Sequence, residues 1–112
     1  MRTSTVAAAG SQIRVIEDGT GQHAVVFVHG VGGWAENWSE TIERVAASGR
    51  RAIAFDLPGF GASTRVDGAR YFDPREPFYP AVVHAVSRAL GLERPHLVGH
   101  SLGGGIAAVT AV

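Results

Sequence analysis

The sequence of 112 residues contains no cysteine and no lysine. Without cysteine, the chain can form no disulfide bond, no thiolate nucleophile and no cysteine-ligated zinc site. All ten basic residues are arginine, which excludes a Walker A phosphate loop, a kinase-type nucleotide lysine and a Schiff-base mechanism within this chain. Ten acidic residues balance the ten arginines, so no net charge attracts the chain to nucleic acid or to an anionic membrane.

Long apolar runs are also missing from the sequence. No stretch reaches the roughly 18 apolar residues of a membrane-spanning helix, and residues 1–10 lack the apolar core of a signal peptide. We therefore expect a cytoplasmic protein without a membrane span. A composition of 46% hydrophobic and 18% charged residues is typical of a folded globular domain. No repeat, linker or low-complexity segment divides the chain, which predicts one domain over residues 1–112.

Strand-like and helix-like segments alternate along the chain. Apolar runs or apolar–polar alternation predict strands over residues 12–17, 24–28, 52–55 and 94–98. Helical spacing predicts helices over 34–46, from Pro80 to Leu90, and from Leu102 onward. The prolines of the stretch 64–80 predict a surface excursion, an irregular segment outside the regular elements. This order predicts an α/β fold, a mostly parallel sheet with helices on both faces.

Near its end the sequence places a serine between glycines, as Gly99-His100-Ser101-Leu102-Gly103. An apolar strand precedes this turn and an apolar helix follows it. Small residues two before and two after the serine relieve the crowding of a sharp strand-to-helix turn, which is the pattern of a nucleophile elbow. The positive end of the following helix favours an oxyanion at this turn.

Three glycine-rich loops follow the predicted parallel strands, at the edge of the sheet where ligands bind in such folds. Acyl transfer needs two N–H donors for the oxygen that becomes negative. We expect these donors to be the main-chain N–H groups of Leu102, directly after the serine, and of Val31 in the first loop. The alternative is that the glycines of residues 29–33 merely permit a tight turn.

The remaining polar and aromatic candidates are assigned structural roles. We expect His29 to stabilise its loop by hydrogen bonds and the side chain of His100 to diverge from the serine, and the other three histidines look like surface residues. None of the five is a credible general base. Asp56 is expected to cap the loop that follows it, because Asp side chains bind nearby N–H groups in turns. Trp34 and Trp38 are expected in the core.

A second interpretation of the first loop remains open. Residues 30–35 fit the pattern G-x-G-x-x-A between a strand and a helix, and Asp56 ends the next strand, which is the layout of a dinucleotide-binding site. The large Trp34 beside the expected pyrophosphate turn and the Pro58-Gly59-Phe60-Gly61 run argue against it. This interpretation would also leave the serine turn unexplained.

Segments 28–33, 56–63 and 98–104 together resemble the N-terminal part of the α/β-hydrolase fold family, in its single-domain esterase-like group. The resemblance implies Ser101 as nucleophile, an oxyanion hole from Val31 and Leu102, a small-molecule acyl substrate, and no cofactor or metal. Relatives that open epoxides or remove halides carry Asp at the nucleophile position. Esterases, lipases, thioesterases, acyltransferases, peptidases and carbon–carbon bond hydrolases remain.

The chain departs from the family in length, since the family continues well beyond the helix after the elbow. The missing part carries the triad acid and His, in the order Ser…Asp/Glu…His. We therefore expect a truncated α/β-hydrolase fold that ends just after the elbow and is inactive alone. The alternative functions are a non-catalytic remnant that binds a ligand or a protein and, third, a dinucleotide-binding oxidoreductase fragment.

The same departure affects the surface of the domain. In the family's sheet order, the strand at residues 96–99 pairs on its far side with a strand that this sequence lacks. We therefore expect an unpaired sheet edge there, with Ile106 and Val109 poorly covered. Such an edge favours self-association or a partner chain.

Overall fold

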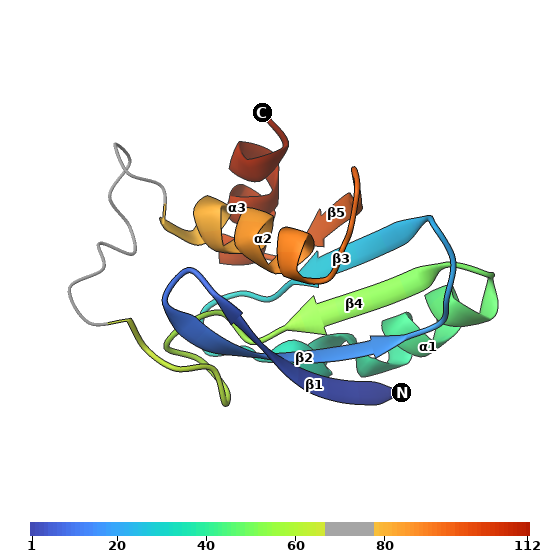
Figure 1. Cartoon of the computed structure of the whole chain (residues 1–112), viewed down its shortest axis with the longest axis horizontal. Coiled ribbons are helices and arrows are strands. Elements are labelled where there is room, and N and C mark those ends of the chain that lie inside the picture. Colours follow the sequence, from blue (N-terminus) through green and yellow to red (C-terminus); the bar gives the residue numbers. More distant parts are fainter. Residues whose placement is uncertain (67–77) are drawn as a thin grey trace.

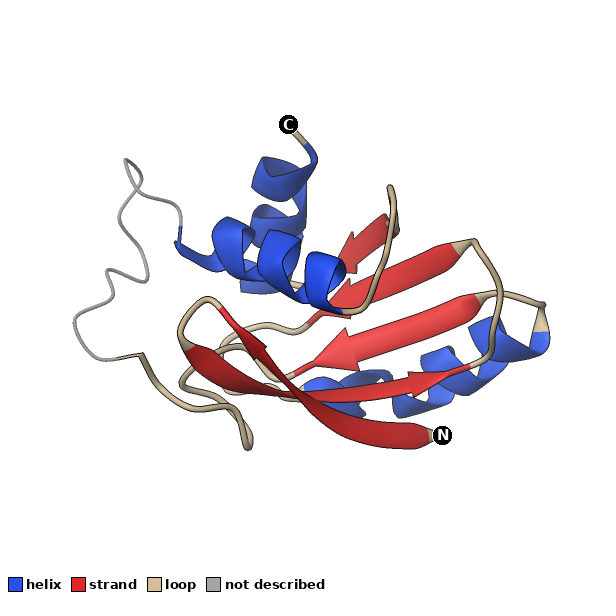
Figure 2. Cartoon of the chain, in the orientation of Figure 1, coloured by secondary structure: helices blue, strands red, loops and turns tan. Residues whose placement is uncertain are grey.

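The computed structural model describes residues 1–66 and 78–112. Along the chain the elements are β1 (Arg2–Ala8), β2 (Ser11–Asp18), β3 (Ala24–Val28), the 3₁₀ helix η1 (Ala35–Trp38), α1 (Ser39–Ala47), β4 (Arg51–Phe55), α2 (Phe78–Ala89), β5 (His96–Gly99) and α3 (Leu102–Ala111) (Figures 1 and 2). The predicted surface excursion over residues 64–80 falls mostly outside the described residues.

The strands form one sheet in the order β1-β2-β4-β3-β5. β3 pairs in parallel with both β4 and β5, whereas β2 pairs antiparallel with β4 and with β1. Helix α1 packs on one face of the sheet, and α2 and α3 pack together on the other (Figure 1). The predicted α/β architecture, a mostly parallel sheet with helices on both faces, is confirmed.

Strand β1 is an element that the sequence patterns did not predict. Residues 2–8 pair along their whole length with β2 through a hairpin whose two turn residues, Ala9 and Gly10, have φ angles of 51° and 77°. Two left-handed residues are what a tight hairpin turn requires, because they match the twist of the strands. Alanine rarely adopts that conformation, so residues 9–10 carry no clear sequence signal for a hairpin turn.

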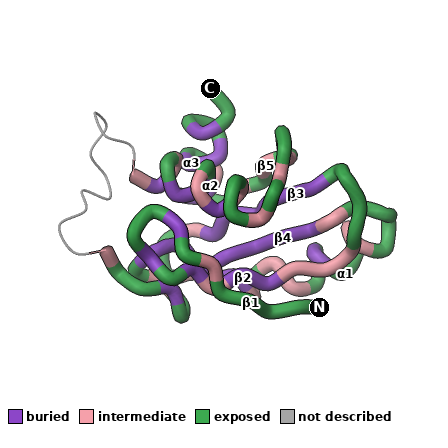
Figure 3. Tube along the Cα trace, viewed as in Figure 1, coloured by how far each residue is buried: buried purple, intermediate pink, exposed green. Residues whose placement is uncertain are grey.

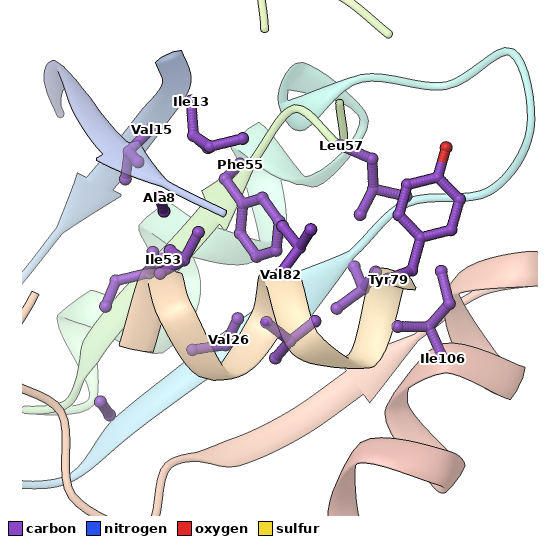
Figure 4. Close-up of a cluster of buried hydrophobic side chains, with 14 residues drawn as sticks. Ala8, Ile13, Val15, Val26, Ile53, Phe55, Leu57, Tyr79, Val82 and Ile106 are labelled. Atoms are coloured by element: carbon purple, nitrogen blue, oxygen red, sulfur yellow. The ribbon is translucent and has the colours of Figure 1, made fainter. Parts of the chain in front are cut away.

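Two apolar clusters hold the sheet to its helices. The larger lies between the sheet and helices α2 and α3, and ten of its side chains are labelled in Figure 4. The smaller lies between the sheet and η1–α1. All five residues of β3 are buried (Figure 3), as predicted for a strand covered on both faces. The central strands therefore give the loops at their ends a fixed support.

The two tryptophans differ in burial. Trp38 is partly buried and packs against the smaller cluster, with its ring centroid 5.0 Å from that of Phe27, so its predicted core position is confirmed in part. The same prediction for Trp34 is wrong, because its side chain is 47% exposed. The backbone at Trp34 is still extended, and η1 begins one residue later with the fully buried Ala35. Alanine thus takes the inward position that the helical spacing assigned to Trp34.

Strand β5 lies at an edge of the sheet and pairs with β3 alone in the part of the chain that the structure describes. Val98 in this strand is 38% exposed, and Val109 on α3 is 55% exposed. Ile106 is only 5% exposed, because it packs into the larger cluster, so the expectation that it is poorly covered is wrong. Among the described helices, none is long and apolar enough to cross a membrane.

Self-association through β5 stays a prediction with a direct test. We expect the wild-type chain to form oligomers as its concentration rises, and Val98→Lys to weaken them, because a charge on an edge strand opposes strand addition. Light scattering over a concentration series measures both. Thr41→Lys, at an exposed position of α1 on the other face of the sheet, is the matched control. A wild-type chain that stays monomeric, or equal weakening by both variants, would contradict the prediction.

Candidate functional site

Ser101 lies on the turn between β5 and α3. Its φ and ψ angles are 57° and −121°, in a region that residues other than glycine rarely adopt and that costs free energy to hold. The side chain is exposed, and the residue occupies the N-cap position of α3. The strand–turn–helix context that the sequence predicts around Ser101 is therefore present.

Glycines on both sides of Ser101 allow the strand, the turn and the helix to pack closely. A Cβ atom at Gly99 would lie 2.0 Å from the carbonyl oxygen of Gly103, and one at Gly103 would lie 2.1 Å from the carbonyl oxygen of Val28. Neither distance is possible for a real side chain. A Cβ at Gly30 would lie 3.1 Å from the Cβ of Ser101, so the loop after β3 passes directly beside the serine.

A cavity of about 570 Å³ lies where these two loops meet. Its lining residues are His29, Gly30, Val31, Gly32, Gly33, Asn37, Trp38, His100 and Ser101. The structure thus brings Val31 and Ser101 to one cavity. Leu102 begins α3 directly after the serine but is not itself a lining residue.

The main-chain N–H groups of Val31 and Leu102 are the two expected oxyanion donors. Within residues 1–66 and 78–112, neither group donates a hydrogen bond to another part of the protein. The Leu102 group is at the N-terminus of α3, where the helix dipole presents partial positive charge. Both groups can therefore donate to an external acceptor.

His29 joins the first loop to the loop after β4. Its imidazole is 1% exposed; Nε2 accepts a hydrogen bond from the Leu57 N–H at 3.0 Å, and Nδ1 donates to the Gly30 carbonyl at 2.7 Å. The edge of the ring also meets Phe60, with centroids 5.4 Å apart. A main-chain N–H can only donate and a carbonyl can only accept, so this imidazole is the neutral Nδ1–H form. Its expected loop-stabilising role is confirmed.

Asp56 makes a second connection between the same loops. Its side chain is fully buried, and its carboxylate accepts hydrogen bonds from the Ala35 N–H at 2.7 Å and the Ala62 N–H at 2.9 Å. A Cβ at Gly61 would lie 2.3 Å from one carboxylate oxygen, so only glycine fits there. The predicted capping role is confirmed. Because both oxygens are occupied and buried, Asp56 is not available to a ribose, which removes the main residue of the dinucleotide interpretation.

An arginine from β2 supplies the charge opposite Asp56. Arg14 Nη1 lies 3.4 Å from the Asp56 carboxylate and 2.7 Å from Glu36, with which Arg14 also makes a second, shorter bond. The hydrogen bonds to Glu36 raise the pKa of Arg14 above its usual value, and Asp56 adds to this while partial burial opposes it. The guanidinium therefore stays charged. Sequence reasoning missed Arg14, because nothing local links it to a carboxylate 42 positions away.

In the described part of the chain, none of the histidines is bound to the serine hydroxyl. All five lie in the described ranges, and in those ranges no hydrogen bond joins a histidine to Ser101 Oγ. Both nitrogens of His29 are occupied, and His100 lines the cavity beside the serine. The other three histidines are exposed. Among the described residues, no group of three His, Asp or Glu side chains could hold a metal ion.

Comparison with known proteins agrees with this geometry. A family model described as "alpha/beta hydrolase fold" matches residues 23–112. The chain is 36% identical over 104 residues to the dihydrolipoyllysine-residue acetyltransferase component of the acetoin cleaving system of Cupriavidus necator. It is 35% identical over 117 residues to a 2-hydroxy-6-oxononadienedioate/2-hydroxy-6-oxononatrienedioate hydrolase of Paraburkholderia phymatum. The solved structure of an epoxide hydrolase from an endophytic Streptomyces is 34% identical, with a TM-score of 0.88.

These similarities cover most of this chain but a minor part of each relative. The matches span 92%, 91% and 98% of this chain, and 26%, 39% and 32% of the acetyltransferase component, the dioate hydrolase and the epoxide hydrolase. The 112 residues thus correspond to about a third of the length of these proteins.

The close packing around Ser101 predicts a large difference between two glycines of α3. Gly103→Ala should lower the free energy of unfolding by about 3 kcal/mol or more, because the new methyl group overlaps the Val28 carbonyl. Gly105→Ala, whose new Cβ would meet no atom within 4 Å beyond its chain neighbours and its own helix backbone, should raise it by up to about 1 kcal/mol through helix propensity. Urea denaturation measures both. Equal effects of the two variants would show that the close contact does not exist.

The buried carboxylate predicts a second stability difference. Asp56→Ala leaves a buried and a partly buried N–H group without an acceptor and should lower the free energy of unfolding by about 3–5 kcal/mol. Glu36→Gln, at the partly exposed end of the same network, should cost about 1 kcal/mol or less. Thermal or urea unfolding gives the comparison. If Asp56→Ala lowers the free energy of unfolding by less than Glu36→Gln does, Asp56 does not hold the two loops together.

Proposed function

Because the chain belongs to the α/β-hydrolase fold family, we propose that it forms the nucleophile side of a serine hydrolase site. The substrate class is an ester, thioester or related acyl compound. The observation that carries the proposal is the position of Ser101, on a left-handed turn that faces the same cavity as Val31. A serine held in this way presents its hydroxyl to a bound carbonyl group.

The first chemical step follows from the groups at the cavity. Ser101 Oγ attacks the carbonyl carbon of the substrate, a new C–O bond forms, and the electron pair of the carbonyl π bond moves onto its oxygen. The N–H groups of Val31 and Leu102, which have no acceptor elsewhere in the described residues, stabilise that oxygen. Loss of one such donor typically raises the barrier by about 2.7–4 kcal/mol.

The step also needs a base for the serine proton. No hydrogen bond connects Ser101 to any of the five histidines, all of which are described. We therefore assign the base, and the carboxylate that orients it, to polypeptide outside these 112 residues. The 112 residues by themselves should then hydrolyse esters very slowly, because a positioned general base typically contributes about 10²–10⁴-fold to the rate.

The relatives indicate what the acyl compound and its acceptor could be. Their names describe an acetyltransferase component and a hydrolase of 2-hydroxy-6-oxononadienedioate, so transfer to a second nucleophile and cleavage of a carbon–carbon bond both belong to the proposed range. Epoxide opening is disfavoured, because the family resemblance implies Asp at the position of Ser101 in such enzymes. Cytoplasmic location is part of the same proposal.

A second candidate function is that of a non-catalytic remnant that binds a ligand or a protein. The observation that favours it is the same lack of a histidine at Ser101. The two candidates differ in whether the serine can still react when a base is supplied, and this difference decides the experiment.

The test uses a fluorophosphonate probe on the purified chain, with intact mass as the readout. We expect little labelling in plain buffer and a clear increase when imidazole is added as an external base, because the proposed site lacks only the base. Ser101→Ala should abolish the increase, because it removes the hydroxyl group. It keeps a Cβ atom at the turn, so the strain of the backbone is unchanged. Ser4→Ala, at an exposed serine of β1, should leave it unchanged.

Two outcomes would contradict the proposal. If imidazole produces no labelling of a chain shown to be folded by circular dichroism, the site is not a nucleophile site and the remnant function stands. If Ser101 is labelled fast without imidazole, a base exists within the 112 residues, and the assignment of that base to other polypeptide is wrong.

A further inference from the structure

A group of basic residues lies at the amino ends of the parallel strands, at the opposite end from Ser101. His23 directly precedes β3, Arg51 begins β4 and His96 begins β5. Ala24 pairs with Arg51 and Val25 pairs with His96, and neighbouring strands are about 4.8 Å apart. In Figure 1 the amino ends of β3 and β4 lie at the right, away from their carboxyl ends. The sheet thus gathers basic residues at the end of the parallel strands that is remote from Ser101.

These residues line a cavity of about 600 Å³. Its walls are the turn over residues 21–24, the start of β4, the loop over residues 91–94, and His96. This volume is within the usual range of small-molecule sites, about 300–1,000 Å³. The cavity shares no residue with the one that contains Ser101.

The ionisable residues that line this cavity are mostly of basic type. They are Arg51, Arg94 and two histidines, with Glu93 as the acidic one, although the whole chain has equal numbers of basic and acidic residues. The guanidinium of Arg51 is held in place by Glu17 at 2.7 Å and by the Leu90 carbonyl at 3.1 Å. Arg51 therefore lines the cavity with its guanidinium already paired, and it is not a free donor.

Arg94 is the free donor of the cavity. Across the described ranges its exposed guanidinium makes no hydrogen bond and no ion pair, and the main-chain N–H groups of Glu93 and Arg94 have no acceptor. Its φ angle is 49°, a conformation that Asn adopts several-fold more often than Arg. A strained residue with an unpaired charge, beside two unpaired N–H groups, is suited to an anion.

We propose that this cavity is a binding site for the phosphate group of a small molecule. Arg94 binds the phosphate oxygens through its planar fork of N–H donors, the imidazoles of His23 and His96 add donors, and the N–H groups of the 93–94 turn complete the contacts. The site is independent of the hydrolase proposal, because it uses none of the residues at the Ser101 cavity.

The test is a titration of the ¹⁵N-labelled chain with inorganic phosphate at constant ionic strength, followed by NMR. We expect saturable shifts of the amide signals of His23, Arg94 and His96, with Val31 and Leu102 unaffected. Arg94→Asn removes the charge and tolerates the left-handed backbone, and it should weaken binding about tenfold, the effect of losing a charge-assisted hydrogen bond. Acetate, with one charge and fewer acceptors, should bind more weakly than phosphate.

Arg44→Gln is the matched control, since it removes one exposed arginine on α1, where Arg44 pairs with Glu40. It should leave phosphate binding unchanged. Shifts that do not saturate, that spread over the whole surface, or that fall equally with both variants would show non-specific ion binding and overturn the proposal. Equal affinity for acetate and phosphate would overturn the assignment to a phosphate group.

Discussion

The site depends on two buried polar side chains that join loops distant in the sequence. His29 and Asp56 are almost completely removed from solvent, and each binds main-chain groups of the loop opposite its own. A buried donor or acceptor without a partner costs about 1–3 kcal/mol, so these bonds oppose any separation of the loops. The loop that carries Val31 is therefore held in a fixed position.

Close backbone packing positions the turn that carries Ser101. The carbonyl groups of Val28 and Gly103 occupy space that any side chain at Gly103 or Gly99 would need, so α3 lies directly against the ends of β3 and β5. This contact sets where Ser101 stands relative to the first loop. The cavity that contains Ser101 thus lies at the carboxyl ends of the parallel strands, and the cavity at their amino ends is separate from it.

Much of this arrangement could be predicted from the sequence, because its signals are local. The run over residues 24–28 matches β3, and the serine turn and the capping role of Asp56 follow from short motifs. Other features depend on distant contacts that no local pattern contains. The ion pairs of Arg14, the burial of Ile106 against α2, and the hairpin that adds β1 all arise only when the sheet forms. Trp34 shows a third case, in which a one-residue shift of the helix start moved a large side chain outward.

The central claim is that buried side chains fix the loops while the main-chain N–H groups of Val31 and Leu102, the proposed oxyanion donors, stay free. Amide hydrogen exchange of the folded chain tests it directly. The N–H groups of Ala35, Leu57 and Ala62, which are bound to Asp56 and His29, should exchange slowly, close to the rate set by global unfolding. Those of Val31 and Leu102 should exchange fast. Equally fast exchange at all five positions would contradict the account.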